Sequence, residues 1–264
     1  MNNPFIIGEV GINALGDIDI AKQLIAVAKE AGADAVKFQK RTIELCYTPE
    51  FLALPRESPW GKTQRDQKEG LEFSFEEYGE IDRYCRELGI DWFASAWDLP
   101  SQHFLKRFNL KYNKIASPMI TNEALLKKVA QERKPTFIST GLGKGLNEAV
   151  AIFRQHNCPF TIMHTVAGKK TDLMYFDRYL TYDNEVRLSE IKRLKDAYNV
   201  PVGFSCHSYS LLVPVLAVAM GAEALEVHIC LDRASYGTDM VCSFEPEGLR
   251  RIVRDARRVR EILK

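Results

Sequence analysis

Eight short apolar runs, interleaved with stretches of helical periodicity, restrict the fold of this chain most. The runs occupy residues 5–10, 34–39, 91–96, 113–117, 135–140, 160–165, 201–206 and 224–229. Amphipathic stretches that indicate helices occupy residues 18–31, 75–88, 122–131, 146–155, 186–198, 211–220 and 247–263. Alternating strands and helices require parallel strands with right-handed crossovers, and eight such units close into a barrel of about 250 residues. We therefore predict an α/β fold, a single-domain (β/α)8 TIM barrel over residues 1–264.

The segments around the second and eighth runs are similar, which supports a repeated unit. EAGADAVKFQ at residues 30–39 resembles AMGAEALEVH at 219–228, and Gly32 and Gly221 are predicted to be the left-handed residues that end helices. An open doubly wound sheet, with its ligand crevice at one switch point, is the alternative arrangement. The longest irregular stretch, residues 41–72, follows the second run and is a candidate lid or dimer contact.

Composition argues against several classes of partner. The 36 Lys and Arg residues nearly balance the 35 Asp and Glu residues, so no basic field predicts binding to nucleic acid or to a membrane. The six cysteines show no CxxC spacing, which is typical of a reducing compartment. The sequence shows neither a signal peptide nor an apolar run of membrane-spanning length. We expect a soluble cytoplasmic protein.

Polar side chains recur near the carboxyl ends of the predicted strands, where barrel enzymes build their active sites. Strand side chains alternate between the two faces, so the inward positions follow at every second residue. The polar residues on the predicted inward face are Glu9, Lys37, Gln39, Ser95, Lys114, Ser139, His164, Ser205, His207, Glu226 and His228. Charged side chains are rarely buried without partners, so this pattern predicts a polar pocket that holds a ligand.

His207 and His228 follow or end neighbouring predicted strands, and their rings are expected within reach of one cation. Glu226 is a candidate to orient a ligating imidazole. Either histidine taken alone is equally compatible with a structural hydrogen bond, and His164 is better explained as structural. The pair at adjacent strand ends favours a metal site.

Lys37 and Lys114 allow three interpretations. They pair with Glu9 and Glu226 in an internal salt-bridge network, or they clamp a phosphate or carboxylate, or one of them forms a Schiff base as in class I aldolases. An anion clamp would gain hydroxyl donors from Ser95, Ser117, Ser139 and Ser205. The Gly-containing segment at residues 139–143 precedes a predicted helix, where backbone N–H groups can bind an anion.

Seven segments in order resemble the sialic acid synthase (N-acetylneuraminate synthase) family. GEVGIN at residues 8–13, with Gly16-Asp17, is similar to the family's AEIGxNHxGD, and residues 32–39 match GADAVKFQ. KIAS at 114–117 and STG at 139–141 match family motifs, and GFSCH at 203–207 resembles GLSDH with Cys206 in place of Asp. The family's ExH strand corresponds to residues 226–228, and GTD at 237–239 with Cys242-Ser243 resembles GPDxxxS. The resemblance covers nearly the whole chain.

The resemblance implies an enzyme that condenses phosphoenolpyruvate with a sugar aldehyde such as N-acetylmannosamine, giving a 2-keto-3-deoxy sugar acid and phosphate. It implies a divalent ion on His207 and His228, expected to be Mn²⁺ with Mg²⁺ or Co²⁺ as alternatives. Glu9 is the expected group for proton handling beside the two histidines. The residues implied to hold phosphoenolpyruvate are Lys37, Ser95, Lys114, Ser117, Ser139 and Ser205, and those implied to face the sugar are Gln39, Tyr179 and Asp239.

Several positions depart from the family pattern. Ala14 replaces a histidine, Met119 replaces an acid after KIAS, and a basic and aromatic stretch at 168–180 replaces a tyrosine-proline turn. The family's C-terminal antifreeze-like domain has no counterpart in the 264 residues. We expect either a truncated chain or a barrel-only relative with a different acceptor. A homodimer is implied, and a separate antifreeze-like domain protein is a candidate partner.

Two other functions are consistent with the same residues. One is a metal-dependent pyruvate aldolase or lyase, which would turn over without releasing phosphate. The other is a catalytically weak barrel that binds a sugar or a partner protein. The departures at Ala14 and Met119 favour the second of these, because they remove polar groups from the expected pocket.

Overall fold

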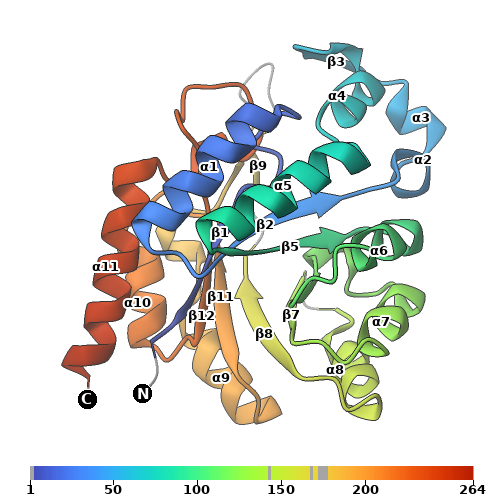
Figure 1. Cartoon of the computed structure of the whole chain (residues 1–264). Helices are drawn as coiled ribbons and strands as arrows, with labels where there is room; N and C mark the ends of the chain where they lie inside the picture. The colour runs from blue at the N-terminus through green and yellow to red at the C-terminus, as the bar shows by residue number, and fades with distance from the viewer. Residues whose placement is uncertain (1–2, 142–143, 167–168, 172–177, 264) are drawn as a thin grey trace.

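A closed barrel of parallel strands forms the centre of the molecule (Figure 1). The computed structural model describes residues 3–141, 144–166, 169–171 and 178–263. The barrel strands, in chain order, are β1 (Phe5–Glu9), β2 (Ala35–Lys40), β5 (Asp91–Ala96), β6 (Asn113–Ile115), β7 (Thr136–Ser139), β8 (Phe160–Thr165), β11 (Val202–Cys206) and β12 (Ala224–His228). The order around the barrel is β1-β12-β11-β8-β7-β6-β5-β2, and β2 pairs with β1 to close it. The predicted TIM barrel is confirmed, and the open sheet is wrong.

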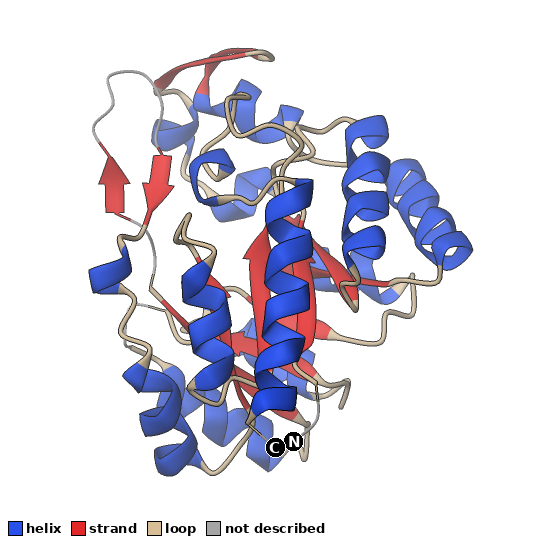
Figure 2. Ribbon diagram, turned by 90° about the vertical axis from the view of Figure 1, so that its left-hand side faces the viewer, coloured by secondary structure: helices blue, strands red, loops and turns tan. Residues whose placement is uncertain are grey.

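Helices cover the outside of the barrel (Figure 2). They are α1 (Ile18–Ala31), α5 (Phe75–Leu88), α6 (Leu99–Lys106), α7 (Glu123–Ala130), α8 (Leu146–Gln155), α9 (Ser189–Tyr198), α10 (Leu212–Ala219) and α11 (Pro246–Ile262). Each of these helices except α6 lies inside a predicted amphipathic stretch or extends one residue beyond it. Gly32 and Gly221 have φ of 89° and 100°, as predicted for residues that end helices. Within the described residues, no helix combines the length and apolar character needed to span a bilayer.

Short elements connect these units. They are the 3₁₀ turns η1 (Ser117–Met119), η2 (Asp183–Glu185) and η3 (Met240–Cys242), and an antiparallel pair, β9 (Lys169–Thr171) with β10 (Arg178–Leu180). The stretch 41–72 contains α2 (Ile43–Cys46), α3 (Pro49–Leu52), β3 (Pro55–Ser58), β4 (Gly61–Thr63) and α4 (Gln64–Gly70). Figure 1 shows this group beyond the carboxyl end of β2.

The stretch 41–72 is packed onto the barrel rim. The carboxylate of Glu72 accepts hydrogen bonds from Lys40 Nζ (2.9 Å) and Arg41 Nε (2.7 Å). The Trp60 ring packs edge-on against Tyr236, with ring centroids 5.8 Å apart. Gly70 must lack a side chain, because an added Cβ would lie 2.1 Å from the Trp60 ring. The roles of this stretch as a lid or as a dimer contact stay predictions.

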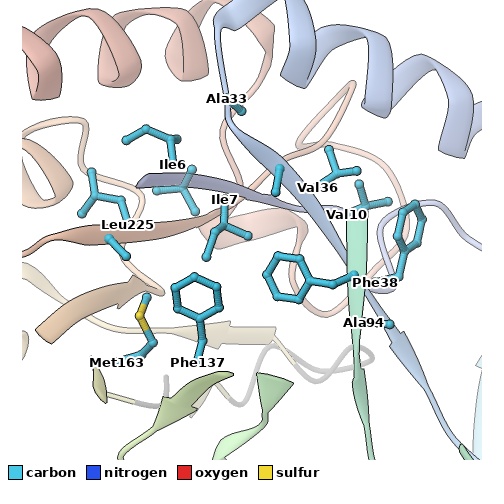
Figure 3. Close-up of a cluster of buried hydrophobic side chains, with 14 of the residues drawn as sticks. Ile6, Ile7, Val10, Ala33, Val36, Phe38, Ala94, Phe137, Met163 and Leu225 are labelled. Carbon is cyan, nitrogen blue, oxygen red and sulfur yellow. The ribbon is translucent and has the colours of Figure 1, made fainter. Parts of the chain in front are cut away.

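Alternation within each strand places apolar side chains on both sides of the barrel wall. Ile6, Val36 and Leu225 face the surrounding helices, while Ile7, Phe137 and Met163 fill the interior (Figure 3). Gly203 gives Met163 its space, because a Cβ at Gly203 would lie 2.5 Å from the Met163 sulfur. These apolar side chains form a packed floor, and the next inward residue of each strand lies above it.

Candidate active site

A cavity of about 240 Å³ opens at the carboxyl ends of the barrel strands. Nearly all of the predicted site residues line it, each from the last inward position of its strand or from the loop that follows. The lining residues are Glu9, Lys37, Gln39, Ser95, Trp97, Lys114, Ala116, Ser117, Pro118, Ser139, Thr165, Ser205, His207, Glu226, His228 and Asp239. The alternation of side chains therefore predicted correctly which residue of each strand faces the cavity, with one exception at β8.

Two lysines and two glutamates form a buried network at the bottom of the cavity. Lys37 Nζ lies 2.8 Å from Glu9 Oε2 and 3.8 Å from Glu226 Oε1. Lys114 Nζ lies 3.0 Å from Glu226 Oε2. All four residues are at most 4% exposed, so each charge depends on its partners. These contacts agree with the salt-bridge interpretation of the lysines.

Serine hydroxyls extend this network toward the cavity wall. Lys37 Nζ donates to Ser95 Oγ (3.2 Å), and Lys114 Nζ donates to Ser139 Oγ (2.7 Å). Ser205 Oγ donates to Glu226 Oε1 at 3.0 Å. Ammonium and hydroxyl donors therefore alternate around one space, an arrangement suited to an anion with several oxygen atoms.

The surroundings of the two glutamates shift their pKa values in opposite directions. Burial raises the pKa of Glu9, and Lys37 only partly opposes that effect. Burial also acts to raise the pKa of Glu226, but the charges of Lys114 and Lys37 outweigh it and hold this pKa well below its usual range. Glu226 therefore favours its ionised form more strongly than Glu9 does. Carboxyl groups whose pKa values are pushed apart in one site commonly divide the charge-holding and proton-transfer roles.

The lysines differ in the same way. Burial lowers the pKa of both ammonium groups, but Glu226 and Glu9 outweigh this for Lys37 and leave its pKa raised. For Lys114 burial prevails, with a further contribution from the charge of Lys37, and its pKa is lowered. Lys37 is therefore the more firmly protonated cation, and Lys114 gains more from an incoming anion.

The imidazole rings of His207 and His228 lie beside this network, with centroids 4.7 Å apart. His228 Nδ1 lies 3.1 Å from the carbonyl oxygen of Cys206, and His207 Nδ1 lies 3.2 Å from Thr165 Oγ1. Burial, followed by the neighbouring His228, lowers the pKa of His207 to about 4. Both rings thus have an oxygen partner at Nδ1, which leaves each Nε2 for another bond.

These two rings fit a divalent ion with an open coordination sphere. Ligating histidines characteristically engage their second nitrogen with an oxygen, as both do here. Asp239 Oδ2 lies 4.0 Å from His228 Nε2, on the side of the ring that faces the cavity lining. Within the described part of the chain, no three His, Cys, Asp or Glu side chains form a metal cage. The protein would therefore supply two imidazoles and leave positions for water or substrate, as catalytic metal sites do.

The strand β8 presents Thr165, not His164, to the cavity, so the predicted inward position of His164 is wrong. His164 is paired in register with Phe204 and Thr165 with Ser205, and Ser205 points inward. The His164 ring packs on Phe204, with centroids 5.8 Å apart, and its Nε2 contacts the Val186 carbonyl oxygen at 2.9 Å. Its predicted structural role agrees with these contacts.

Of the two roles considered for Glu226 from the sequence, the pairing with the lysines is present, and the contact with an imidazole is not. The imidazoles are contacted instead by Thr165 Oγ1, at His207 Nδ1, and by the Cys206 carbonyl oxygen, at His228 Nδ1. Sequence reasoning also missed Trp97, Ala116 and Pro118, which line the cavity just beyond β5 and β6. Their position next to inward-facing Ser95 and Lys114 was the available signal.

The departures from the family pattern have structural counterparts. Asn13 Nδ2 donates to the Ile229 carbonyl (2.9 Å) and to Ser243 Oγ (2.7 Å), which fastens the loop after β12. Ala14 is buried, and Met119 packs against the core. Cys206 donates to the Ser208 carbonyl oxygen. The predicted sugar contact Tyr179 belongs to β10, whose side chains lie outside the described residues.

Comparisons with known proteins agree with this geometry. Residues 24–264 match the model of the NeuB family. The chain is 35% identical to the N-acetylneuraminate-9-phosphate synthase of Homo sapiens over 98% of this chain and 71% of the relative. It is 33% identical to the N,N'-diacetyllegionaminic acid synthase of Legionella pneumophila, over 98% of this chain and 73% of the relative.

A solved structure shows the same barrel. It is the N-acetylneuraminic acid (sialic acid) synthetase of Leptospira borgpetersenii in complex with citrate, with a TM-score of 0.86 and 31% identity. The similarity covers 99% of this chain and 85% of that chain. The barrel, the ordered motifs and the comparisons lead to one assignment: this chain belongs to the NeuB family, whose members are sialic acid synthase-like.

Proposed function

We propose that this protein joins phosphoenolpyruvate to the aldehyde carbon of an amino sugar, and that it releases phosphate and a 2-keto-3-deoxy sugar acid. The observation that carries the proposal is the convergence of two buried lysines and two imidazoles in one cavity. The lysines suit a small polyanion, and the imidazoles suit a divalent ion beside it. The two relatives named above, which are synthases of N-acylated sugar acids, support an amino-sugar acceptor.

Phosphoenolpyruvate carries a phosphate and a carboxylate, and the cavity offers donors for both. Lys37 with Ser95 and Lys114 with Ser139 form two ammonium–hydroxyl pairs. Ser117 and Ser205 add hydroxyl groups from the same lining. Binding would exchange part of the contact between the lysines and Glu226 for contact with the substrate anion, so the lysines would remain paired throughout.

His207 and His228 are the residues that would hold the divalent ion, with Mn²⁺ the first to test and Mg²⁺ and Co²⁺ as alternatives. Such an ion supplies Lewis-acid polarisation of the acceptor aldehyde oxygen. The carbon C3 of phosphoenolpyruvate attacks the aldehyde carbon, and the aldehyde oxygen takes up a proton to become a hydroxyl group. Water then adds at C2, and the C2–O bond to phosphate breaks.

Glu9 is the proposed proton-handling group in these steps. Its Oε1 accepts a hydrogen bond from Gln39 Nε2 at 2.9 Å, and its raised pKa brings proton uptake closer to neutral pH. Gln39 and Asp239 line the cavity on either side of β1 and would orient the sugar. A homodimer in the cytoplasm is the accompanying expectation.

The proposal is tested by incubating the protein with phosphoenolpyruvate, Mn²⁺ and a panel of 2-acetamido sugars and other aldoses. Phosphate and 2-keto acid are measured together, and the expected result is equal amounts of both with at least one acceptor. A 2-keto acid consumed or formed without phosphate would support the aldolase alternative. No phosphate with any acceptor, despite bound metal and phosphoenolpyruvate, would overturn the proposal.

A further inference from the structure

A second cavity, of about 820 Å³, lies outside the barrel wall beside β8. It is larger than the catalytic cavity, and its volume is within the range of small-molecule binding sites. The loop after β7, the first turn of α8, the end of β8 and one face of α9 line it. None of the steps above uses this space.

Two exposed cationic side chains that line the second cavity are unpaired. Lys144 and Arg187 make no side-chain hydrogen bond or ion pair with any residue that the structure describes. Arg193, by contrast, is bound to Glu190, with 2.7 Å between Nη2 and Oε2. Glu148 is then the one other carboxylate in the lining, so positive charge is in excess there.

The amino end of α8 adds backbone donors to these charges. Gly145 precedes the first turn and has no side chain, so the N–H groups of that turn lack a side-chain cap. Residues of this turn line the second cavity. Because the amino end of a helix is partially positive, its free N–H groups and the two unpaired cations together favour an anion with several oxygens.

The backbone around Arg187 is held in an unusual conformation. Arg187 has φ of 48°, in the left-handed region that residues other than glycine rarely adopt. The preceding residue, Val186, is fixed through its carbonyl oxygen, which lies 2.9 Å from Nε2 of the buried His164. Burial lowers the pKa of His164, and the nearby charge of Arg187 acts in the same direction. Such strained positions persist where the surrounding structure fixes them, commonly at ligand sites.

Thr165 lines both cavities, so the second cavity adjoins the side of the barrel that carries the imidazoles. The backbone N–H of Thr165 donates to Thr140 Oγ1 at 3.3 Å, and Thr140 also lines the second cavity. The Thr165 hydroxyl lies 3.2 Å from His207 Nδ1. A ligand in the second cavity would therefore lie next to the residue that holds His207.

We propose that the second cavity binds the phosphoryl group of a phosphate monoester other than phosphoenolpyruvate. A phosphoryl group has up to two negative charges and three terminal oxygens, which match the two unpaired cations and the free N–H groups. The phosphate of phosphoenolpyruvate has its own donors, Lys37 and Lys114, in the catalytic cavity. Two sources share this chemistry: a phosphate on the acceptor sugar, which rests on the proposed function, and a separate phosphorylated molecule.

Titration calorimetry with inorganic phosphate tests the site. The protein is saturated with phosphoenolpyruvate and Mg²⁺ and contains no sugar, so the catalytic cavity is filled and no turnover occurs. One phosphate should bind, and Arg187→Gln and Lys144→Gln should each weaken it about tenfold to hundredfold, as for hydrogen bonds to charged groups. Lys127→Gln, which removes an exposed lysine paired with Glu123 on α7, is the control and should not change it. Phosphate that does not bind, or that binds equally well to the wild type and both variants, would overturn the inference.

Steady-state kinetics with N-acetylmannosamine 6-phosphate and N-acetylmannosamine identify the source of the phosphoryl group. If it belongs to the acceptor, Arg187→Gln should raise the KM of the phosphorylated sugar about tenfold and leave that of the other sugar within about twofold. If both KM values are unchanged while Arg187→Gln weakens phosphate binding, the ligand is a separate phosphorylated molecule. A protein that binds phosphate through Arg187 but condenses neither sugar would sink the proposed reaction and leave this inference standing.

Discussion

Thr165 Oγ1 lies 3.2 Å from His207 Nδ1, so a hydroxyl group on β8 holds an imidazole that follows β11. If Nδ1–H donates to this hydroxyl, the lone pair is on Nε2, the nitrogen available to a metal. His228 has its Nδ1 on the Cys206 carbonyl oxygen, which can only accept, so its tautomer is already set. Thr165 is therefore the side chain that completes the metal-binding tautomer of the pair.

Thr165→Val keeps the shape of the side chain and removes the hydroxyl. We expect Mn²⁺ affinity to fall about tenfold to hundredfold, as for other partners of ligating histidines. Titration calorimetry measures this, with His207→Ala as the reference for loss of the site. Thr165→Ser should restore most of the affinity, because it restores the oxygen. Equal Mn²⁺ affinity in the wild type and Thr165→Val would contradict the role given to Thr165.

Lys114 carries the second prediction, because its Nζ contacts both Ser139 and Glu226 in the cavity. Lys114→Ala should weaken phosphoenolpyruvate binding about tenfold to hundredfold, the usual value of a hydrogen bond to a charged group. Binding is measured in the presence of metal and without acceptor. Lys127→Ala, which removes an exposed lysine on α7, is the matched control. Unchanged affinity in Lys114→Ala would mean that the cavity is not the anion clamp.

Glu226→Gln leaves two buried lysines without their shared anion. The free energy of unfolding should fall by about 3–5 kcal/mol, because removing one partner of a buried ion pair leaves an uncompensated charge. Phosphoenolpyruvate should then raise the Tm more in Glu226→Gln than in the wild type, since the substrate no longer competes with Glu226 for Lys114. Thermal melts with and without the ligand check this. A smaller ligand-induced shift in the variant would argue against such competition.

The strands could be predicted from the sequence because each is a short apolar run. Their side chains alternate with a period of two residues, which also indicates the polar residues that face inward. His164 shows the limit of that approach. Its inward or outward direction depends on the register between β8 and β11, where His164 pairs with Phe204 and Thr165 with Ser205. Such a long-range pairing is absent from any single run.

The sequence offered the pairing of the lysines with Glu9 and Glu226 only as one of three interpretations, because it could not show which groups meet. Glu226 and Lys114 are far apart in the sequence, and their 3.0 Å contact crosses the barrel interior. The helix α6 was missed because it is short and depends on Asp98, whose carboxylate accepts from Ser101 N–H at its first turn. These features depend on tertiary contacts and not on local pattern.

The raised pKa of Glu9 predicts a dependence of stability on pH. An acid whose folded pKa lies above its unfolded value binds more protons in the folded state, so its contribution is fully present below the unfolded value and is lost as pH rises through the folded pKa. For Glu9 the loss begins near the ordinary value of 4.5 and arises mainly from burial of the carboxylate. Glu9→Gln cannot ionise and should escape this loss. The unfolding free energy of Glu9→Gln relative to the wild type should therefore increase as pH rises above about 4.5.

Urea denaturation at a series of pH values measures this difference in unfolding free energy. Glu30→Gln, on the exposed face of α1, should give a difference that does not grow over the same range. A difference for Glu9→Gln that is flat or falls with pH would mean that Lys37 outweighs burial and that Glu9 stays ionised, which would remove it as the proton-handling group.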